Sequence, residues 1–201
     1  NYESTRRCGL DAVSQWWCVD YGATRMTYPV EDFYGVIPAT TVSDIISWQG
    51  SCALSASRGV ICGSLRNLYS ELGRGFIGGH TGSFVVPGLP SDIVSVTSDN
   101  ETNCALSAQH DLWCWGRWST DPYAAPILVP TIVRHNVTQF TGMCANHVDN
   151  SVACLSKRSN EYRWIEQGAI DPLRTIDNWY DGKVCGISFT STVVCFDPFI
   201  P

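Results

Sequence analysis

The sequence predicts an all-β fold, namely a five-bladed β-propeller of short antiparallel blades with one disulfide-stapled hairpin in each blade. Three observations lead to this prediction. The ten cysteines form five pairs, and the two members of every pair are ten positions apart. The first cysteines of successive pairs are separated by 44, 52, 40 and 41 residues, a period typical of propeller blades. Short runs of β-branched and aromatic residues flank the turns between paired cysteines, as expected for strands.

Each cysteine frame has the pattern of a β-hairpin, with a small apolar arm, a polar turn and a second arm rich in strand-forming residues. Folding 52–62 so that Cys52 faces Cys62 puts Leu54 opposite Val60. Directly opposed residues in a non-hydrogen-bonded antiparallel pair have Cα atoms about 4.5 Å apart, which suits a disulfide. A metal site is the alternative, but metal sites usually use cysteines separated by only about two to four residues. The predicted disulfides are therefore Cys8–Cys18, Cys52–Cys62, Cys104–Cys114, Cys144–Cys154 and Cys185–Cys195.

Length and composition limit the class of protein. A chain of 201 residues is long enough to bury one core, so we expect a single domain over 1–201. Only 16% of the residues are charged and eight are tryptophan, which argues against disorder. The formal net charge of −6 argues against nucleic acid and anionic membranes as partners. No run of eighteen apolar residues occurs, so no membrane span is predicted.

Regular cysteine pairing predicts an oxidising compartment, so we expect a secreted, cell-surface or extracellular-matrix protein. There is no signal peptide at Asn1, and we interpret the sequence as a mature chain from which a signal or a preceding domain has been removed. Two sequons, beginning at Asn100 and Asn136, agree with this compartment. Both are interpreted as occupying the same place in their repeats, which favours N-glycosylation at Asn100 and Asn136. The alternative is two unused sequons in ordinary loops.

Two of the repeats carry a family resemblance. Cys52–Gly75 and Cys104–Gly116 both contain an alanine-leucine arm and a glycine shortly after the second cysteine, and the first of them ends in Asn67 followed by Glu71-Leu72-Gly73-Arg74-Gly75. This pattern resembles the regulator of chromosome condensation repeat, which the other three repeats match in part. The resemblance implies a β-propeller of four-stranded blades. The family's usual propeller has seven blades, whereas five hairpins are present here.

The first repeat has too few residues before Cys8 for a complete blade. Residues 198–201, Pro-Phe-Ile-Pro, look like the start of the missing segment, so we expect the tail to complete the first blade and close the ring. The alternative is an open arc that a neighbouring chain or domain completes. An unfinished blade leaves an edge strand exposed, and such edges pair with other chains.

The sequence predicts no catalytic residue, no metal and no cofactor. His110 and His147 fall in or near predicted turns, so we expect solvated turn residues rather than ligands. There is no G-x-S-x-G nucleophile elbow, and five cysteine pairs leave no free thiol. Asp44 and Asp92 each precede an isoleucine at the start of a repeat strand and are interpreted as turn or edge residues. We therefore expect that the chain is not an enzyme.

Aromatic residues are the best candidates for binding. Trp118, Tyr123, Tyr162 and Trp164 lie in predicted connecting segments. Exposed tryptophan and tyrosine rings suit a protein interface or the stacking of a sugar. The alternative is that these rings pack between blades.

We interpret the chain as a non-enzymatic extracellular glycoprotein with a structural, filament-forming or adhesive role. It is expected to self-associate or to bind extracellular proteins through blade edges and loops. A lectin with glycan sites between blades is the alternative, and the unequal connecting loops favour the first function. Inhibition of another enzyme through the loop face, known for propellers resembling this one, is a third function that stays open. The predicted disulfides and the acidic charge argue against the nuclear exchange-factor role of the family's namesake.

Overall fold

The computed structural model describes residues 6–10, 16–20, 27–29, 44–49, 52–57, 59–64, 67–78, 82–99, 102–118, 125–141, 144–158, 161–167, 173–178 and 184–196. These residues form five small antiparallel sheets and contain no α-helix. No described segment is a helix long and apolar enough to cross a membrane. The protein is therefore all-β in the part that the structure describes, as predicted.

The sheets follow one another in chain order. Sheet 1 consists of β1 (Arg6–Leu10), β2 (Trp16–Asp20) and β3 (Thr27–Pro29), and sheet 2 of β4 (Ile45–Gln49), β5 (Cys52–Ser55), β6 (Gly59–Ser64) and β7 (Gly82–Val85). Sheet 3 consists of β8 (Ile93–Asp99), β9 (Thr102–Ser107), β10 (Leu112–Gly116) and β11 (Ile127–Arg134). Sheet 4 consists of β12 (Val137–Phe140), β13 (Cys144–His147), β14 (Val152–Arg158) and β15 (Glu161–Glu166), and sheet 5 of β16 (Leu173–Asn178), β17 (Val184–Ser188) and β18 (Val193–Phe196).

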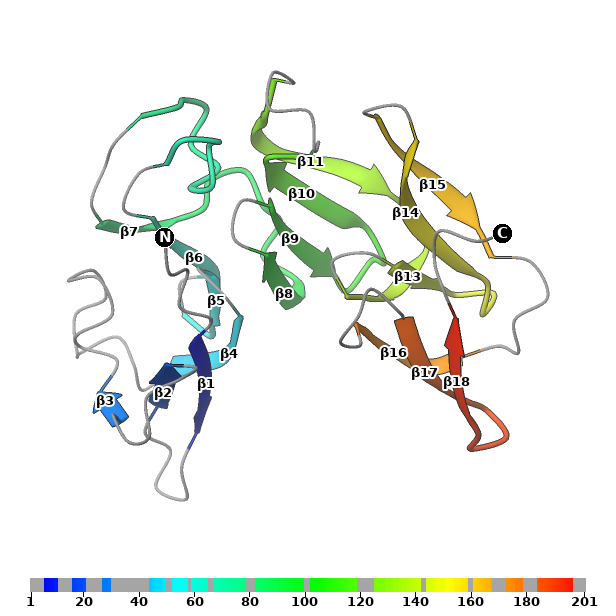
Figure 1. The fold of residues 1–201 in the computed structure, drawn as a ribbon. Coiled ribbons are helices and arrows are strands. Elements are labelled where there is room, and N and C mark those ends of the chain that lie inside the picture. Colours follow the sequence, from blue (N-terminus) through cyan, green and yellow to red (C-terminus); the bar gives the residue numbers. More distant parts are fainter. Residues whose placement is uncertain are drawn as a thin grey trace.

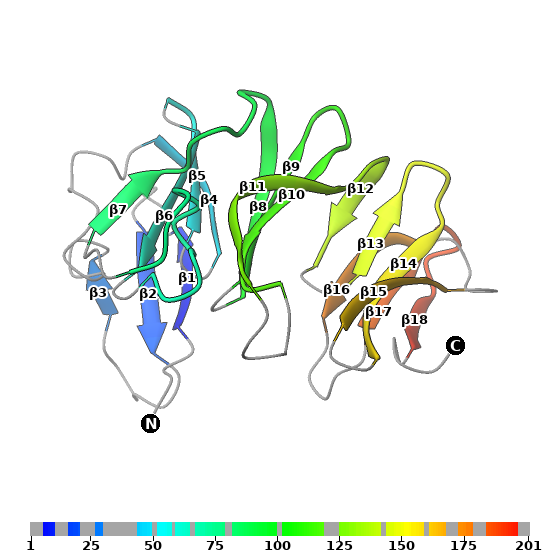
Figure 2. The ribbon, with the colours of Figure 1, turned by 90° about the horizontal axis from the view of Figure 1, so that it is seen from above.

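The sheets are arranged along an arc, with sheet 1 and sheet 5 at its two ends (Figures 1 and 2). Neighbouring sheets along the chain contact each other, as β5 contacts β8 and β13 contacts β16. Sheet 1 has no strand before β1 among the described residues. Residues 198–201, predicted to supply that strand, lie outside the described residues.

The disulfide hairpins have the predicted register. Cys52 is opposite Cys62 and Leu54 is opposite Val60. In three hairpin turns the N–H of the third turn residue donates to the carbonyl of the residue before the turn. The bonds run from His110 to Ser107, from Asn150 to His147 and from Ser191 to Ser188, with N–O distances of 2.9 to 3.0 Å. That third residue has a positive φ, close to 67° in His110 and Asn150. A three-residue hairpin loop with its last residue in the left-handed region has this geometry, and it accounts for the constant ten-residue spacing.

Among the described side chains there are four disulfides: Cys52–Cys62, Cys104–Cys114, Cys144–Cys154 and Cys185–Cys195. Their Cα–Cα distances are 4.0 to 4.1 Å. Each bond joins directly opposed residues of the two middle strands of a blade-like sheet, or of the last two strands in sheet 5. Cys8 is opposite Cys18 in β1 and β2, and the side chains of this pair lie outside the described part.

The core lies between the sheets. We call the side of a sheet that carries its paired cysteines the cysteine face, and the opposite side the receiving face. The cysteine face of sheet 2 packs against Ala105 and Trp115 on the receiving face of sheet 3. In the same way, the cysteine face of sheet 3 packs on sheet 4, and that of sheet 4 packs on sheet 5. One repeated packing mode therefore joins sheets 2 to 5.

The structure also shows how the start of each repeat is held. The carbonyl oxygens of Asp44, Asp92 and Asn136 accept hydrogen bonds of 2.8 to 2.9 Å from the N–H groups of Ala56, Ala108 and Val148, in the turn of the next hairpin. Asp44 and Asp92 thus lie directly before the first strand of their sheets, β4 and β8, and are bonded to the following hairpin turn.

The interpretation that the two sequons occupy the same place in their repeats is wrong. Asn136 lies between two sheets, where it is equivalent to Asp44 and Asp92. Asn100 lies between β8 and β9 of one sheet, outside the described residues. The cysteine spacing alone did not show which segments form the first strand of each sheet.

Candidate functional site

A polar surface pocket of about 420 Å³ lies where sheet 3 meets sheet 4. Its walls come from the end of β11, the connection to β12, the β13–β14 turn and the end of β15. The lining residues are Arg134, His135, Asn136, His147, Val148, Asp149, Ser151 and Glu166. The junction thus brings together three separate segments of the sequence, namely 134–136, 147–151 and 166.

Arg134 is the central residue of this pocket. Its guanidinium contacts the Glu166 carboxylate, and its Nε–H donates to Nε2 of His147. The guanidinium also lies over the Trp164 ring, 4.7 Å from the ring centroid. Because one cation engages a carboxylate, an imidazole and an aromatic face, Arg134 ties β11 to β13 and β15.

The hydrogen bonds fix the tautomer of His147. Arginine can only donate, so Nε2 of His147 is the acceptor and the neutral ring carries its proton on Nδ1. Nδ1 lies 3.0 Å from Oγ of Ser151, which in turn donates to Asp149 Oδ1 at 2.7 Å. The Ser151 hydroxyl therefore accepts a hydrogen bond from Nδ1–H of the imidazole instead of donating one to it. This is the reverse of the arrangement that activates a serine nucleophile.

His147 is buried, so the expectation of a solvated turn residue is wrong for it. Burial and the positive charge of Arg134 lower the pKa of His147 below its ordinary value of 6.5. The hydrogen bonds from the side chain and the N–H of Ser151 lower the pKa of Asp149. The pocket thus favours a neutral imidazole between a guanidinium and a hydroxyl group.

We predict that stability falls on the acid side because of His147. The pKa of His147 is lower in the folded chain than in the unfolded chain. Its contribution to stability is therefore complete above pH 6.5 and declines as the pH falls toward the pKa of the folded chain. His147→Gln should remove this part of the decline. Thermal unfolding midpoints at neutral and mildly acidic pH measure it, with the exposed His135→Gln as the control. An unchanged pH profile in His147→Gln would contradict the prediction.

Two of the four candidate aromatic residues can be located fully. Trp118 and Trp164 are half-buried and pack against the core between sheets 3 and 4, and Trp164 lies near Phe140 with 6.2 Å between ring centroids. The packing alternative therefore describes their position better than exposure does. Tyr123 lies outside the described residues, and Tyr162 is in β15 with its side chain outside the described part. Of the four, the two that the structure describes pack against the same core.

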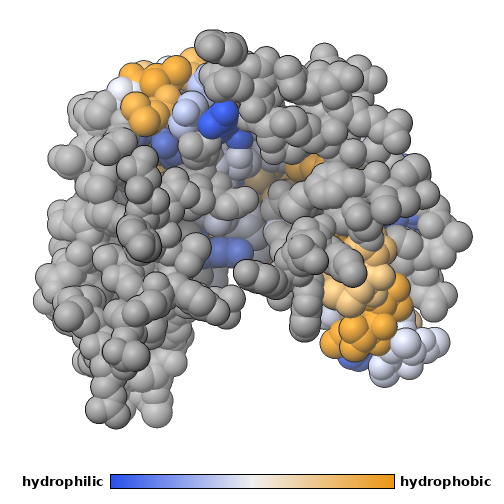
Figure 3. Space-filling model, in the orientation of Figure 1, coloured by the Kyte–Doolittle hydropathy of each residue, from blue (hydrophilic) through white to orange (hydrophobic). Residues whose placement is uncertain are grey.

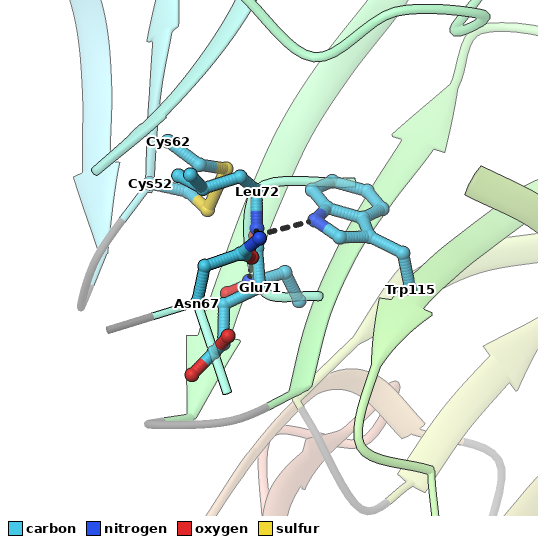
Figure 4. Close-up of a disulfide and its surroundings, with 7 residues drawn as sticks. Cys52, Cys62, Asn67, Glu71, Leu72 and Trp115 are labelled. Atoms are coloured by element: carbon cyan, nitrogen blue, oxygen red, sulfur yellow. Dashed lines mark hydrogen bonds between the residues drawn. A yellow bond between two sulfur atoms is a disulfide. The ribbon is translucent and has the colours of Figure 1, made fainter. Parts of the chain in front are cut away.

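A second candidate surface is formed by the loop after β6, residues 67–78, which we call the clamp loop. Trp115 Nε1–H donates to the carbonyl of Glu71 at 2.9 Å (Figure 4). Asn103 Nδ2–H donates to the same carbonyl at 2.8 Å, so both residues tie the loop to sheet 3. Within the loop, Asn67 accepts from the Leu72 N–H and donates to the Phe76 carbonyl. The residues that carry the family resemblance thus hold one sheet to the next.

Gly73 allows the close approach of the clamp loop to sheet 3. Its φ is 62°, and a Cβ built there would lie 3.0 Å from Val86 and 3.1 Å from Trp115. A larger residue would be strained both in its backbone and in its contacts.

The outer side of the clamp loop is apolar. Two hydrogen bonds of 2.9 Å, from Ser70 Oγ and from the Gly75 N–H, join the loop to the Leu128 carbonyl at the start of β11. Arg74 lies over the rings of Phe76 and Phe84. The exposed apolar residues of this area are Leu68, Phe76, Ile77, Leu128 and Val129, which we call the loop surface. Figure 3 shows apolar side chains gathered in this region, at the upper left.

Sequence reasoning missed both the Arg134 network and the loop surface. Glu166 is 32 positions from Arg134, and no local spacing signals their contact. For the loop surface there was a signal, since Phe76-Ile77 is an apolar pair inside a glycine-rich loop. Among the described residues, no group of three or more histidine, cysteine or acidic side chains is placed to hold a metal.

No protein-family model matches this chain, and no curated protein matches it in sequence. Its fold is similar to the crystal structure of human WBSCR16, with a TM-score of 0.66 and 14% identity, over 90% of this chain and 56% of that one. It is also similar to a chain in the crystal structure of Kap60 bound to yeast RCC1 (Prp20), with a TM-score of 0.62 and 9% identity, over 96% and 54%. The chain has the fold of RCC1-like propeller proteins.

The RCC1-like fold agrees with the resemblance seen in the sequence of the second and third repeats. This chain spans just over half the length of each RCC1-like structure. At 14% identity or less, the similarity concerns the fold, and function has to be argued from the surfaces described above.

Proposed function

We propose that this chain is a non-enzymatic extracellular module that binds proteins through its loops and the ends of its arc. The four disulfides are consistent with an extracellular or secreted location. The orientation of Ser151 toward His147 supports a structural role for the polar pocket instead of catalysis. In the similar yeast structure, RCC1 is bound to another protein, Kap60.

We also propose that each of the five sheets is one propeller blade. Sheets 2, 3 and 4 have four strands each, which is the blade size that the resemblance implies. Sheets 1 and 5 contribute three strands each within the described residues.

The observation that carries the proposed function is the loop surface. Of the five exposed apolar side chains, Leu68, Phe76 and Ile77 lie on the clamp loop, and Leu128 and Val129 lie on β11, to which hydrogen bonds hold the loop. Contiguous exposed apolar patches mark sites of protein interaction, and a fixed backbone lowers the entropic cost of binding. An adhesive or structural module would use such a surface to bind an extracellular protein.

An array of purified extracellular proteins tests this proposal. The native, non-reduced chain is compared with Ile77→Asp/Val129→Asp and with Val94→Asp, an exposed strand valine in sheet 3 that serves as the matched control. We expect a binder that the control retains and the double variant loses. Binders that the double variant retains, or an array without binders, would overturn the proposed use of the loop surface.

A lectin is the second candidate function, and the polar pocket between sheets 3 and 4 favours it. Its arginine, asparagine, acidic and hydroxyl side chains suit the hydroxyl groups of a sugar. Arg134 covers one face of Trp164, which leaves this ring poorly placed for sugar stacking. A glycan array with Glu166→Gln as the variant tests the lectin: glycan binding that this variant loses would support it.

N-glycosylation of the chain is a separate prediction. Asn136 is exposed, and its φ of 59° is one that asparagine and aspartate tolerate. Asn136→Asp should therefore preserve the fold and lower the mass by one glycan when the chain is made in secretory cells. Asn150→Asp is the matched control, since Asn150 is also exposed with a positive φ but is not in a sequon. Equal masses for Asn136→Asp and the wild type would show that this sequon is unused.

A further inference from the structure

Along β18 the cysteine face of sheet 5 is exposed, unlike the same face of sheets 2 to 4. The residue two positions before the second cysteine is 2% exposed in Val60, 1% in Leu112 and 3% in Val152, but 68% in Val193. Cys62, Cys114 and Cys154 are fully buried, whereas Cys195 is exposed. Figure 3 shows apolar side chains on the surface at the lower right, where Figure 1 places β17 and β18.

The strand pairing shows which side chains form this face. Val193 is directly opposite Ile187, and Cys195 is opposite Cys185, so these four residues lie on one side of the β17–β18 hairpin. Val194 and Phe196 lie on the other side and pack against sheet 4. One side of the hairpin is therefore used in the core, and the other presents an aliphatic surface around a disulfide.

The interior of the molecule shows what covers such a face. In all three described cores, the cysteine face of one sheet packs on the receiving face of the next sheet along the chain. The receiving face has a small residue directly after the first cysteine, as in Ala105 and Ala145, and this residue is buried. The face of sheet 5 is thus one more copy of a surface that the chain buries against a neighbouring sheet.

Sheet 1 offers the matching surface. Gly9 directly follows Cys8 in β1, at the register position of Ala105 and Ala145. Among the described residues, no sheet precedes sheet 1 along the chain, so this side does not receive the cysteine face of a preceding sheet as sheets 3 to 5 do. Sheets 1 and 5 are at opposite ends of the arc, so within one molecule they do not meet (Figures 1 and 2).

We propose that the cysteine face of sheet 5 binds the receiving face of sheet 1 in a second copy of this chain. The contact continues the packing already used between sheets 2 and 5. It is heterologous, with different surfaces on the two copies, so it produces head-to-tail assembly into a ring or a filament. This inference rests on the proposed role in protein binding, to which it adds the partner and the two contact surfaces.

Two variants, each with one blocked end, test the proposal. Val193→Glu places a charge on the face of sheet 5, and Gly9→Arg places a long cation on the receiving side of sheet 1. Sedimentation velocity of the non-reduced chains should show assemblies for the wild type and monomers for each variant alone. An equimolar mixture of the two variants should form dimers and nothing larger, because each supplies one intact end. Val94→Glu is the control and should assemble like the wild type.

Three results would overturn the proposal. Assembly of Val193→Glu like the wild type would place self-association on another surface. Assemblies larger than dimers in the mixture, or the absence of dimers, would exclude a heterologous contact between these ends. A monomeric wild type whose β1 and β18 amides are both protected from hydrogen exchange would show closure within one chain. If Gly9→Arg does not fold, a small proportion of Val193→Glu added to the wild type should still shorten the assemblies. None of these results depends on the protein array, so the loop surface and this contact can fail separately.

Discussion

Replacing Cys104 and Cys114 with alanine is expected to lower the free energy of unfolding by more than about 3 kcal/mol. Closing a loop of this size removes about 3 kcal/mol of conformational entropy from the unfolded chain. Both cysteines are also buried in the core between sheets 3 and 4, so the packing of their two sulfur atoms is lost as well. Chemical denaturation followed by tryptophan fluorescence measures the change.

The Cys185→Ala/Cys195→Ala variant is the matched control for this experiment. Its disulfide closes a loop of the same length, but Cys195 is exposed. It should lose the entropic contribution with little loss of packing, and therefore be destabilised less. If the loss of the half-exposed Cys185–Cys195 pair cost as much as the loss of the buried Cys104–Cys114 pair, or more, the account of the sheet-to-sheet core would be contradicted.

Trp115→Ala is expected to cost about 3–5 kcal/mol, the usual range for removing a fully buried large aromatic side chain. Trp115 is fully buried on the receiving face of sheet 3. Its indole N–H also donates to the Glu71 carbonyl, and its ring packs against Gly73. Its removal therefore loosens the clamp loop as well as the core. Denaturation midpoints measure the first effect, and hydrogen exchange of residues 67–78 measures the second.

Trp115→Phe separates the hydrogen bond from the packing. It keeps most of the buried ring and removes the N–H donor, while Asn103 still donates to the Glu71 carbonyl. A loss of about 1 kcal/mol is expected for one hydrogen bond. If the alanine variant were no less stable than the phenylalanine variant, Trp115 would not be the packing centre described here.

The local structure could be predicted from the sequence because the strongest constraints are local. A cysteine pair ten positions apart determines the register of its own hairpin, so Cys52 and Cys62 were placed opposite each other correctly. The Asn67 and Glu71–Gly75 pattern indicated the RCC1-like fold, although what these residues do became clear only from the contacts of Glu71 with Asn103 and Trp115.

The surfaces could not be predicted because they depend on how sheets pack on one another. Trp164 was expected in an exposed segment, but it lies in β15 and packs between two sheets under Arg134. Val193 has the same local sequence environment as the buried Val152, and only its place at the end of the arc makes it exposed. Periodicity within a repeat does not record which neighbour covers which face.

The mass of the native, non-reduced protein in solution tests the central claim most directly, namely that this RCC1-like module works by binding protein, including its own copies. Light scattering over a wide concentration range, with electron microscopy of the same sample, gives both mass and shape. We expect masses that increase with concentration and rings or filaments whose repeating unit is one arc. A compact particle with the mass of a single chain at every concentration would contradict the claim.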